Sequence, residues 1–219
     1  MLNEKTHPHA GQPVLAAGAA LDAAQAVMIL VHGRGADARS ILDLAAYLPQ
    51  PGLAFLAPQA AVNTWYPYSF LTPLDENEPY LSSALRRLGE VVEEMITAGF
   101  TSEQIILGGF SQGACLASEY VARNARRYGG LVVFSGGLIG PPGTIRDYPG
   151  SLAGTPVFIG CSDIDPHIPL ARVEETAETL TRLGGEVDLR IYPRMGHTIN
   201  QDEMNAAAAL LAAAAGQPL

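Results

Sequence analysis

The pentapeptide Gly109-Phe110-Ser111-Gln112-Gly113 restricts the fold of this chain more than any other stretch. Residues 104–108 before it form a short apolar, β-branched run that is typical of a buried strand, and residues 114–127 after it read as a helix. A strand, a sharp turn and a helix in this order expose a serine hydroxyl at the turn. We therefore predict that Ser111 is a nucleophile, against the alternative of a tight Gly/Ser turn without chemistry.

Buried strands and helices alternate along the rest of the chain. Continuous apolar runs predict strands buried on both faces at 26–31, 53–57, 131–134 and 155–160. Helices are expected at 38–48, 77–98, 170–183 and 201–215, and strands nearer the sheet edges at 14–18 and 187–192. This pattern predicts an α/β protein with a mainly parallel central sheet and helices on both faces. We expect residues 1–219 to form one domain, with 1–12 as an irregular N-terminal arm.

Composition excludes several classes of partner. The formal net charge of −9 argues against nucleic acid and anionic membrane surfaces. No run of about twenty apolar residues is present, which predicts no membrane span, and the first residues lack the apolar core of a signal peptide. Cys115 and Cys161 are the only cysteines and are expected to be small buried residues. A reduced, cytoplasmic protein is the expectation.

A serine hydroxyl needs a base to accept its proton and a third group to orient that base. In this kind of sheet the base comes last in the sequence, in the loop after the final strand, and His197 occupies that place. His167 is the alternative, although it lies in the loop expected to carry the acid. His32 directly follows a strand and is expected to support its loop.

The orienting acid is expected after the strand at 155–160, where Asp163 and Asp165 both qualify. Asp165 precedes Pro166, which favours an extended conformation and holds the loop. We therefore prefer Asp165 and expect Asp163 to accept a turn or cap hydrogen bond.

Negative charge on a carbonyl oxygen requires two backbone donors. The first is expected to be the N–H of Gln112, which follows the nucleophile. The second is expected in the Gly33-Arg34-Gly35 loop, where glycines allow a ligand to approach the backbone. We assign it to the N–H of Arg34, whose side chain is expected to be solvated.

Residues 59–76 form a long loop that contains the only tryptophan, and loops of this length are usually functional or disordered. Its aromatic content argues against disorder. Apolar side chains are expected to line a substrate pocket, namely Trp65, Tyr66, Phe70 and Leu71 from this loop, and Leu138 and Ile139 from the Gly- and Pro-rich stretch at 138–154. An exposed aromatic loop also suits a lid or a homodimer contact.

At this point the chain resembles the phospholipase/carboxylesterase group of α/β-hydrolases, which includes acyl-protein thioesterases. The matching pieces span residues 32–197 in the expected order: His32-Gly33-x-Gly35, Trp65-Tyr66, Gly109-Phe110-Ser111-Gln112-Gly113, Phe134-Ser135-Gly136-Gly137-Leu138, Asp163-x-Asp165-Pro166-x-x-Pro169 and Gly196-His197. One departure is that family loops often carry Gly-x-Gly-Asp, whereas Gly35 is followed by Ala36-Asp37.

The resemblance implies an α/β-hydrolase fold with Ser111, Asp165 and His197 as the catalytic triad. It implies hydrolysis of small or medium-chain carboxylic esters, or of thioesters, with no cofactor and no metal. Acyl-protein thioesterase or lysophospholipase activity is the alternative within the enzymes. A hydrolase-fold binding protein without turnover is the alternative outside them, although such proteins generally lose a triad member. A dienelactone-hydrolase-like enzyme is disfavoured, because the nucleophile position holds serine rather than cysteine.

Overall fold

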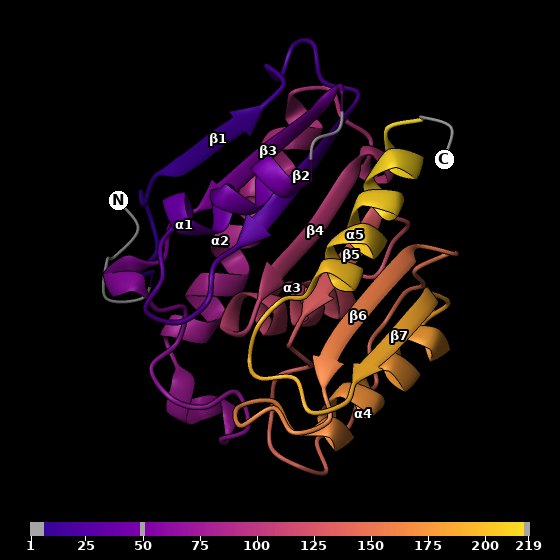
Figure 1. Cartoon of the computed structure of the whole chain (residues 1–219). Coiled ribbons are helices and arrows are strands. Elements are labelled where there is room, and N and C mark those ends of the chain that lie inside the picture. The colour runs from indigo at the N-terminus through magenta and orange to yellow at the C-terminus, as the bar shows by residue number, and fades with distance from the viewer. Residues whose placement is uncertain (1–6, 49–50, 217–219) are drawn as a thin grey trace.

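The computed structural model describes residues 7–48 and 51–216 of the chain. Within these residues seven strands form one sheet in the order β1-β3-β2-β4-β5-β6-β7. Their bounds are β1 Val14–Gly18, β2 Ala26–Val31, β3 Leu53–Pro58, β4 Ile105–Phe110, β5 Gly130–Phe134, β6 Pro156–Ser162 and β7 Glu186–Tyr192. β1 is antiparallel to β3 and the other neighbours are parallel (Figure 1), which confirms the predicted mainly parallel sheet.

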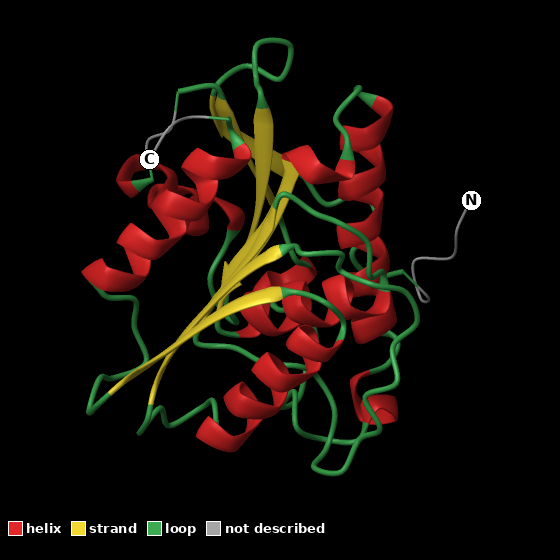
Figure 2. Cartoon of the chain, turned by 90° about the vertical axis from the view of Figure 1, so that its right-hand side faces the viewer, coloured by secondary structure: helices red, strands yellow, loops and turns green. Residues whose placement is uncertain are grey.

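Helices cover both faces of the sheet (Figure 2), as predicted. The α-helices are α1 Ala38–Leu42, α2 Tyr80–Thr97, α3 Gln112–Arg123, α4 Leu170–Arg182 and α5 Gln201–Ala214. Short 3₁₀ turns are η1 Asp43–Tyr47, η2 Ala61–Asn63, η3 Leu74–Asn77 and η4 Ser102–Gln104. One core joins α2, α3 and α4 to the sheet, and a second joins α1 and α5 to its opposite face.

Strand β2 explains why the sequence shows continuous apolar runs rather than alternation. All six of its side chains are buried. Val27 and Ile29 belong to the core under α2, α3 and α4, while Met28 and Leu30 belong to the core under α1 and α5. Because both faces of the sheet are covered, every position of such a strand must be apolar.

Several helix boundaries differ from the predicted ones. The predicted helix 77–98 begins only at Tyr80, because the buried Asn77 side chain donates to Ser69 O and accepts from the N–H of Tyr68 instead. The predicted helix 38–48 narrows into the 3₁₀ turn η1, a common change at helix C-termini. Its predicted stop at Pro49 lies outside the described residues.

The described part of the N-terminal arm, residues 7–12, has no helix or strand, but it is hydrogen-bonded to the rest of the domain. His7 and His9 are buried. The His7 ring contacts Ser83 Oγ at 2.7 Å and Glu90 Oε1 at 3.1 Å, and His9 donates from Nε2 to Trp65 O at 2.9 Å. Residues 7–12 are therefore hydrogen-bonded to α2 and to the aromatic loop at 59–76. The polar sequence did not indicate this role.

Among the described residues, none of the helices combines the length and the apolar composition that crossing a membrane requires. The parallel strands all end at one edge of the sheet (Figure 1). The loops that follow β2, β4, β6 and β7 therefore meet there, and the candidate site residues come from these loops.

Candidate active site

Ser111 occupies a sharp turn between β4 and α3. Its backbone has φ 56° and ψ −120°, a conformation that side-chain-bearing residues rarely adopt. Its N–H donates to Phe134 O on the neighbouring strand at 3.0 Å, which holds the turn in place. The strand extends to Phe110, two residues beyond the predicted end, so that Ser111 follows it directly.

The glycines of the motif are required by the close approach of β2. A Cβ atom built on Gly109 would lie 2.5 Å from Val31 O, and one built on Gly113 would lie 2.0 Å from the same oxygen. Any larger residue at either position would collide with the backbone of β2. The turn between β4 and α3 could then not lie as close to β2 as it does.

A hydrogen-bonded chain leads from Ser111 to a buried carboxylate. Ser111 Oγ lies 2.9 Å from Nε2 of His197, and His197 Nδ1 lies 2.7 Å from Asp165 Oδ2. The side chain of His197 is 17% exposed and that of Asp165 is 0% exposed. The geometry allows the ring to accept the serine proton at Nε2 while the carboxylate orients the ring through Nδ1–H.

The two aspartates of the β6 loop do different things. Asp165 contacts His197, whereas Asp163 Oδ1 accepts a hydrogen bond from the N–H of Arg194 at 2.7 Å. Arg194 has φ 57°, so Asp163 holds a strained turn in the loop that carries His197. The ring of His167 packs edge-on against that of His197, with centroids 4.8 Å apart, and does not lie between Asp165 and Ser111.

Hydrogen bonds keep Asp165 ionised despite its burial. Burial alone would raise the pKa of this carboxyl group, but the contact with His197 and the N–H groups of His167 and Ile168 together lower its pKa. These two N–H groups donate to Asp165 Oδ1 at 2.8 and 3.0 Å. A charged carboxylate beside Nδ1 stabilises a positively charged ring.

The residues predicted as backbone donors, Arg34 and Gln112, come from the loop after β2 and from the first turn of α3, which meet beside Ser111. Gln112 is the first residue of α3, where N–H groups have no partner within the helix. A Cβ atom built on Gly33 would lie 3.5 Å from Ser111 Cβ, so the loop of Arg34 lies directly against Ser111. Both residues line the same cavity as Ser111.

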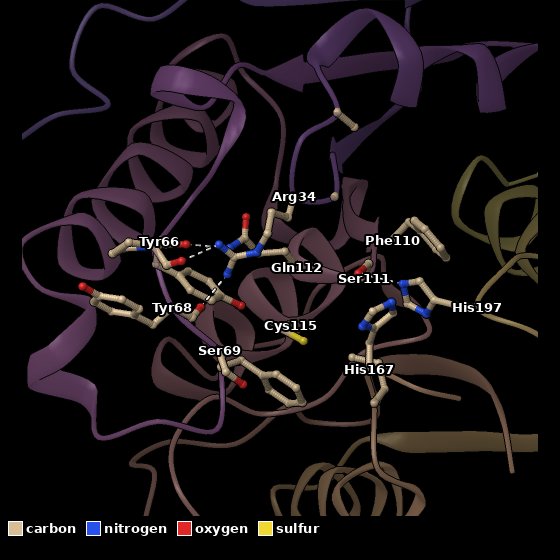
Figure 3. Close-up of a pocket in the computed structure, with 15 residues that line it drawn as sticks. Arg34, Tyr66, Tyr68, Ser69, Phe110, Ser111, Gln112, Cys115, His167 and His197 are labelled. Atoms are coloured by element: carbon tan, nitrogen blue, oxygen red, sulfur yellow. Dashed lines mark hydrogen bonds between the residues drawn. The ribbon is translucent and has the colours of Figure 1, made fainter. Parts of the chain in front are cut away.

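The cavity has a volume of about 530 Å³ and opens beside Ser111 (Figure 3). Its wall includes two of the predicted pocket residues, Tyr66 and Phe70. Other lining residues were not predicted for the pocket, namely Ala36, Pro67, Tyr68, Ser69, Phe110, Cys115, His167 and Ile168.

The loop at 59–76 is held by the side chains of Gln112 and Arg34, which both line the cavity. Gln112 Oε1 accepts from the N–H of Trp65 at 2.9 Å, and its Nε2 donates to Tyr66 O at 2.9 Å. Arg34 donates from Nη1 to Pro67 O at 2.6 Å and from Nη2 to Tyr68 O. Arg34 is exposed, as predicted, but its guanidinium also holds the loop through these two carbonyls. Sequence reasoning missed both contacts, because the partners are backbone carbonyls and an N–H group that no motif marks.

Two buried histidines accept hydrogen bonds from the backbone of the loop at 59–76. His32 accepts at Nε2 from the N–H of Ala60, and His9 accepts at Nδ1 from the N–H of Ala61. Burial, the largest effect, lowers the pKa of both rings, which favours the neutral form that can accept. His32 also donates from Nδ1 to Gly33 O at 2.8 Å, which confirms the prediction that it supports its own loop.

Four predicted pocket residues lie away from the cavity. Trp65 is 0% exposed, and its indole N–H donates to His32 O at 2.9 Å, so it packs the loop onto the core. Leu71 packs half-buried against the same core. Leu138 and Ile139 are buried in the core. Their backbone is held by Arg172, which donates to Leu138 O at 2.7 Å, and by Glu119, which accepts from the N–H of Ile139 at 3.0 Å.

Both cysteines are free and buried, as predicted. Burial, the largest effect, raises the pKa of each thiol to about 12. Each is therefore a neutral thiol near pH 7 and a weak nucleophile. Within residues 7–48 and 51–216, no group of three or more His, Cys, Asp or Glu side chains is placed to hold a metal ion.

The loop that carries His197 ends at the N-terminus of α5. Asn200 and Glu203 form a capping box, in which Glu203 Oε2 accepts from the N–H of Asn200 at 2.8 Å. The other oxygen, Oε1, is buried against Gly160 with no hydrogen-bond partner among the described residues. Burial raises the pKa of Glu203 to about 7.

Comparison with known proteins gives consistent results. The sequence model of the phospholipase/carboxylesterase family matches residues 15–214. The chain is 29% identical over 214 residues to acyl-protein thioesterase 1 of Eremothecium gossypii, covering 87% of this chain and 88% of that protein. It is 31% identical over 126 residues to acyl-protein thioesterase 1 of Saccharomyces cerevisiae, a match that spans 56% of this chain and 55% of the yeast protein.

Among solved structures, a phospholipase/carboxylesterase from Dyadobacter fermentans is 42% identical to the chain. It superposes with a TM-score of 0.88 and covers 92% of this chain and 96% of the other.

Proposed function

Because the chain belongs to the phospholipase/carboxylesterase family of α/β-hydrolases, we propose that it cleaves carboxylic esters through an acyl-enzyme on Ser111. The chain is a hydrolase of esters or thioesters. The serine mechanism and the preferred acyl group are our proposal. One observation carries it, namely the 2.9 Å contact from Ser111 Oγ to His197 and the 2.7 Å contact from His197 to Asp165.

Acylation begins when Ser111 Oγ attacks the carbonyl carbon of the ester. His197 Nε2 accepts the hydroxyl proton as the new C–O bond forms. Asp165 stabilises the resulting imidazolium through Nδ1–H. When the tetrahedral intermediate collapses, the bond to the alcohol breaks, and His197 returns the proton to the departing oxygen. An acyl group then remains on Ser111.

Deacylation repeats these steps with water. His197 accepts a proton from water as the oxygen attacks the acyl-enzyme, and it then protonates Ser111 Oγ as the carboxylic acid leaves. In both halves the negative oxygen accepts hydrogen bonds from the N–H groups of Arg34 and Gln112. Each such donor contributes about 100- to 1,000-fold to the rate in comparable enzymes.

The preferred substrates in this proposal are esters of small or medium-chain acids. A volume of about 530 Å³ supports this size, since pockets for small molecules span roughly 300–1,000 Å³. The thioesterases among the relatives support a second candidate, cleavage of thioesters on acylated proteins. The same residues serve both reactions, so only a comparison of substrates separates them.

Labelling of Ser111 tests the mechanism. We expect a fluorophosphonate to modify the wild type at Ser111 and to leave Ser111→Ala unlabelled. We also expect Ser111→Ala to lower kcat for a p-nitrophenyl ester by about a millionfold. A folded wild type that is neither labelled nor active would refute the proposal and favour a binding protein. A series of acyl lengths, run as matched esters and thioesters, then distinguishes the two enzyme candidates.

Location and oligomeric state stay predictions. The free, buried state of both cysteines is what a reducing compartment favours, so we retain the cytoplasm as the predicted location. Light scattering on the purified protein tests the predicted homodimer.

A further inference from the structure

The Tyr66 hydroxyl is a polar group in the cavity wall that the proposed mechanism does not use. The residue is 1% exposed and lines the cavity with Arg34 and Cys115. Apart from the Cys115 thiol, no hydrogen-bond partner for its hydroxyl is found among the described residues. Burial, the largest effect, raises the pKa of Tyr66, so the group is a neutral phenol that can both donate and accept a hydrogen bond.

The neighbours of Tyr66 offer little compensation. The Cys115 thiol is a hydrogen-bonding neighbour of the hydroxyl, but a thiol is only a weak donor and acceptor. The Arg34 guanidinium lies 5.8 Å from the centre of the Tyr66 ring and donates to backbone carbonyls of the loop. Buried hydroxyls in proteins normally have a partner, so each unpaired one calls for an explanation.

The position of His197 indicates which part of a substrate meets this hydroxyl. His197 must protonate the departing alcohol, so the alcohol lies on the His197 side of Ser111. Figure 3 shows Tyr66 and Cys115 on the other side of Ser111 from His197. The acyl chain therefore extends towards Tyr66 and Phe70, which line that part of the cavity.

We propose that Tyr66 is a specificity-determining residue whose hydroxyl hydrogen-bonds an oxygen substituent on the acyl chain. The preferred substrates are then esters of short hydroxy or oxo acids rather than of plain hydrocarbon acids. A hydrocarbon chain in this position would offer the buried hydroxyl no partner. Sites built to hydrogen-bond a substrate discriminate strongly against analogues that lack the group. The inference rests on the acyl-enzyme mechanism proposed above.

Matched p-nitrophenyl esters test this directly, because the leaving group is constant. β-Hydroxybutyrate is compared with isovalerate, in which a methyl group replaces the hydroxyl, and with unsubstituted butyrate. We expect wild-type kcat/KM for the hydroxylated ester to exceed that for isovalerate by about tenfold or more. In Tyr66→Phe we expect the ratio of the hydroxylated ester to isovalerate to fall to about one, because the ring remains and only the hydroxyl is lost.

Tyr128→Phe is the matched control. Tyr128 is also buried, its hydroxyl donates to Asn124 O at 3.0 Å, and it is not among the residues that line the cavity. Its loss should leave the ratio unchanged. If Tyr66→Phe fails to fold, inhibition of the wild type by β-hydroxybutyrate and by isovalerate is compared instead, and equal inhibition constants overturn the inference.

Two other results overturn the inference while leaving ester hydrolysis intact. A wild-type ratio near one means that solvent or packing satisfies the Tyr66 hydroxyl. A Tyr66-dependent preference for hydroxyethyl over propyl butyrate, without one for the hydroxylated acid, moves the contact to the alcohol. The proposed function fails differently, through absence of turnover of every ester and of fluorophosphonate labelling.

Discussion

Asp163 and Asp165 are two residues apart on one loop, yet their contacts differ completely. Asp165 accepts two backbone hydrogen bonds at Oδ1 and contacts His197 at Oδ2. Asp163 accepts from the N–H of Arg194. The first arrangement positions a charge against His197, whereas the second holds a turn.

Separate substitutions should distinguish the two aspartates. We expect Asp165→Asn to lower kcat by about ten-thousandfold, because an amide no longer stabilises the imidazolium and favours the wrong ring tautomer. Asp163→Asn should lower kcat only a few-fold, since an amide oxygen can still accept from Arg194. Steady-state kinetics on one p-nitrophenyl ester measures both, and a larger loss in Asp163→Asn would assign the acid role to Asp163.

Residues that lie at strand ends were predictable, and residues whose role depends on packing were not. Ser111, Asp165 and His197 follow three strands in the order that this sheet requires, and they are in contact. Trp65 was misassigned, because an aromatic residue in a long loop can face the cavity or the core. Only the contact of its indole N–H with His32 O decides between them.

At the scale of elements, the loop at 59–76 and the N-terminus of α3 act as one unit. Gln112 contributes its N–H to the proposed oxyanion site and its side chain to the loop, through Trp65 and Tyr66. Movement of the loop would therefore displace the donor, and displacement of the donor would loosen the loop.

Gln112→Met should uncouple these two elements. The substitution keeps the backbone N–H and a similar side-chain length, but it leaves Trp65 N and Tyr66 O without their partner. Each buried group left unpaired costs about 1–3 kcal/mol. We expect a lower Tm, a KM raised about tenfold and a red shift in the fluorescence of Trp65, the single tryptophan.

Gln201→Met on the exposed start of α5 is the control for the change of residue type. If fluorescence and KM in Gln112→Met match those of the control, the loop does not depend on Gln112.

Element types were predictable because buried strands and amphipathic helices have distinct patterns. The first and last residues of these helices and strands were harder to predict. The start of α2 depends on Asn77 bonding to the loop, a contact between residues that no periodicity reveals. The burial of His7 and His9 likewise depends on partners about 50 to 80 residues away.

At the scale of the whole molecule, the buried carboxyl of Glu203 links stability to pH. Its pKa of about 7 exceeds the ordinary value of 4.5. Between these values the unfolded chain releases a proton that the folded chain keeps, so stability falls as pH rises. The loss is complete above the folded pKa and amounts to about 3 kcal/mol at most.

Glu203→Gln should remove this dependence, because an amide stays neutral and can still accept from the N–H of Asn200. We expect the variant to gain stability over the wild type as pH rises from about 5 to about 8. Urea unfolding at several pH values measures the difference. Glu178→Gln on the exposed face of α4 is the control, and parallel curves for wild type and Glu203→Gln would contradict the prediction.

The fold class was fully predictable, since alternating buried strands and helices allow few other sheets. The prediction of a single domain stays a prediction. What the sequence did not reveal is that one oxygen of the buried Glu203 carboxyl group would have no hydrogen-bond partner among the described residues, because that depends on the space beside Gly160.

The order of the chain has a consequence during protein synthesis. Ser111 and the histidine that contacts it are separated by 86 residues. At about 5–20 residues per second, the ribosome adds His197 roughly 4 to 17 seconds after Ser111. Under the proposed mechanism, the growing chain lacks its proton acceptor until then and cannot attack cellular esters. Ester turnover in a translation reaction would then report only chains that extend past His197.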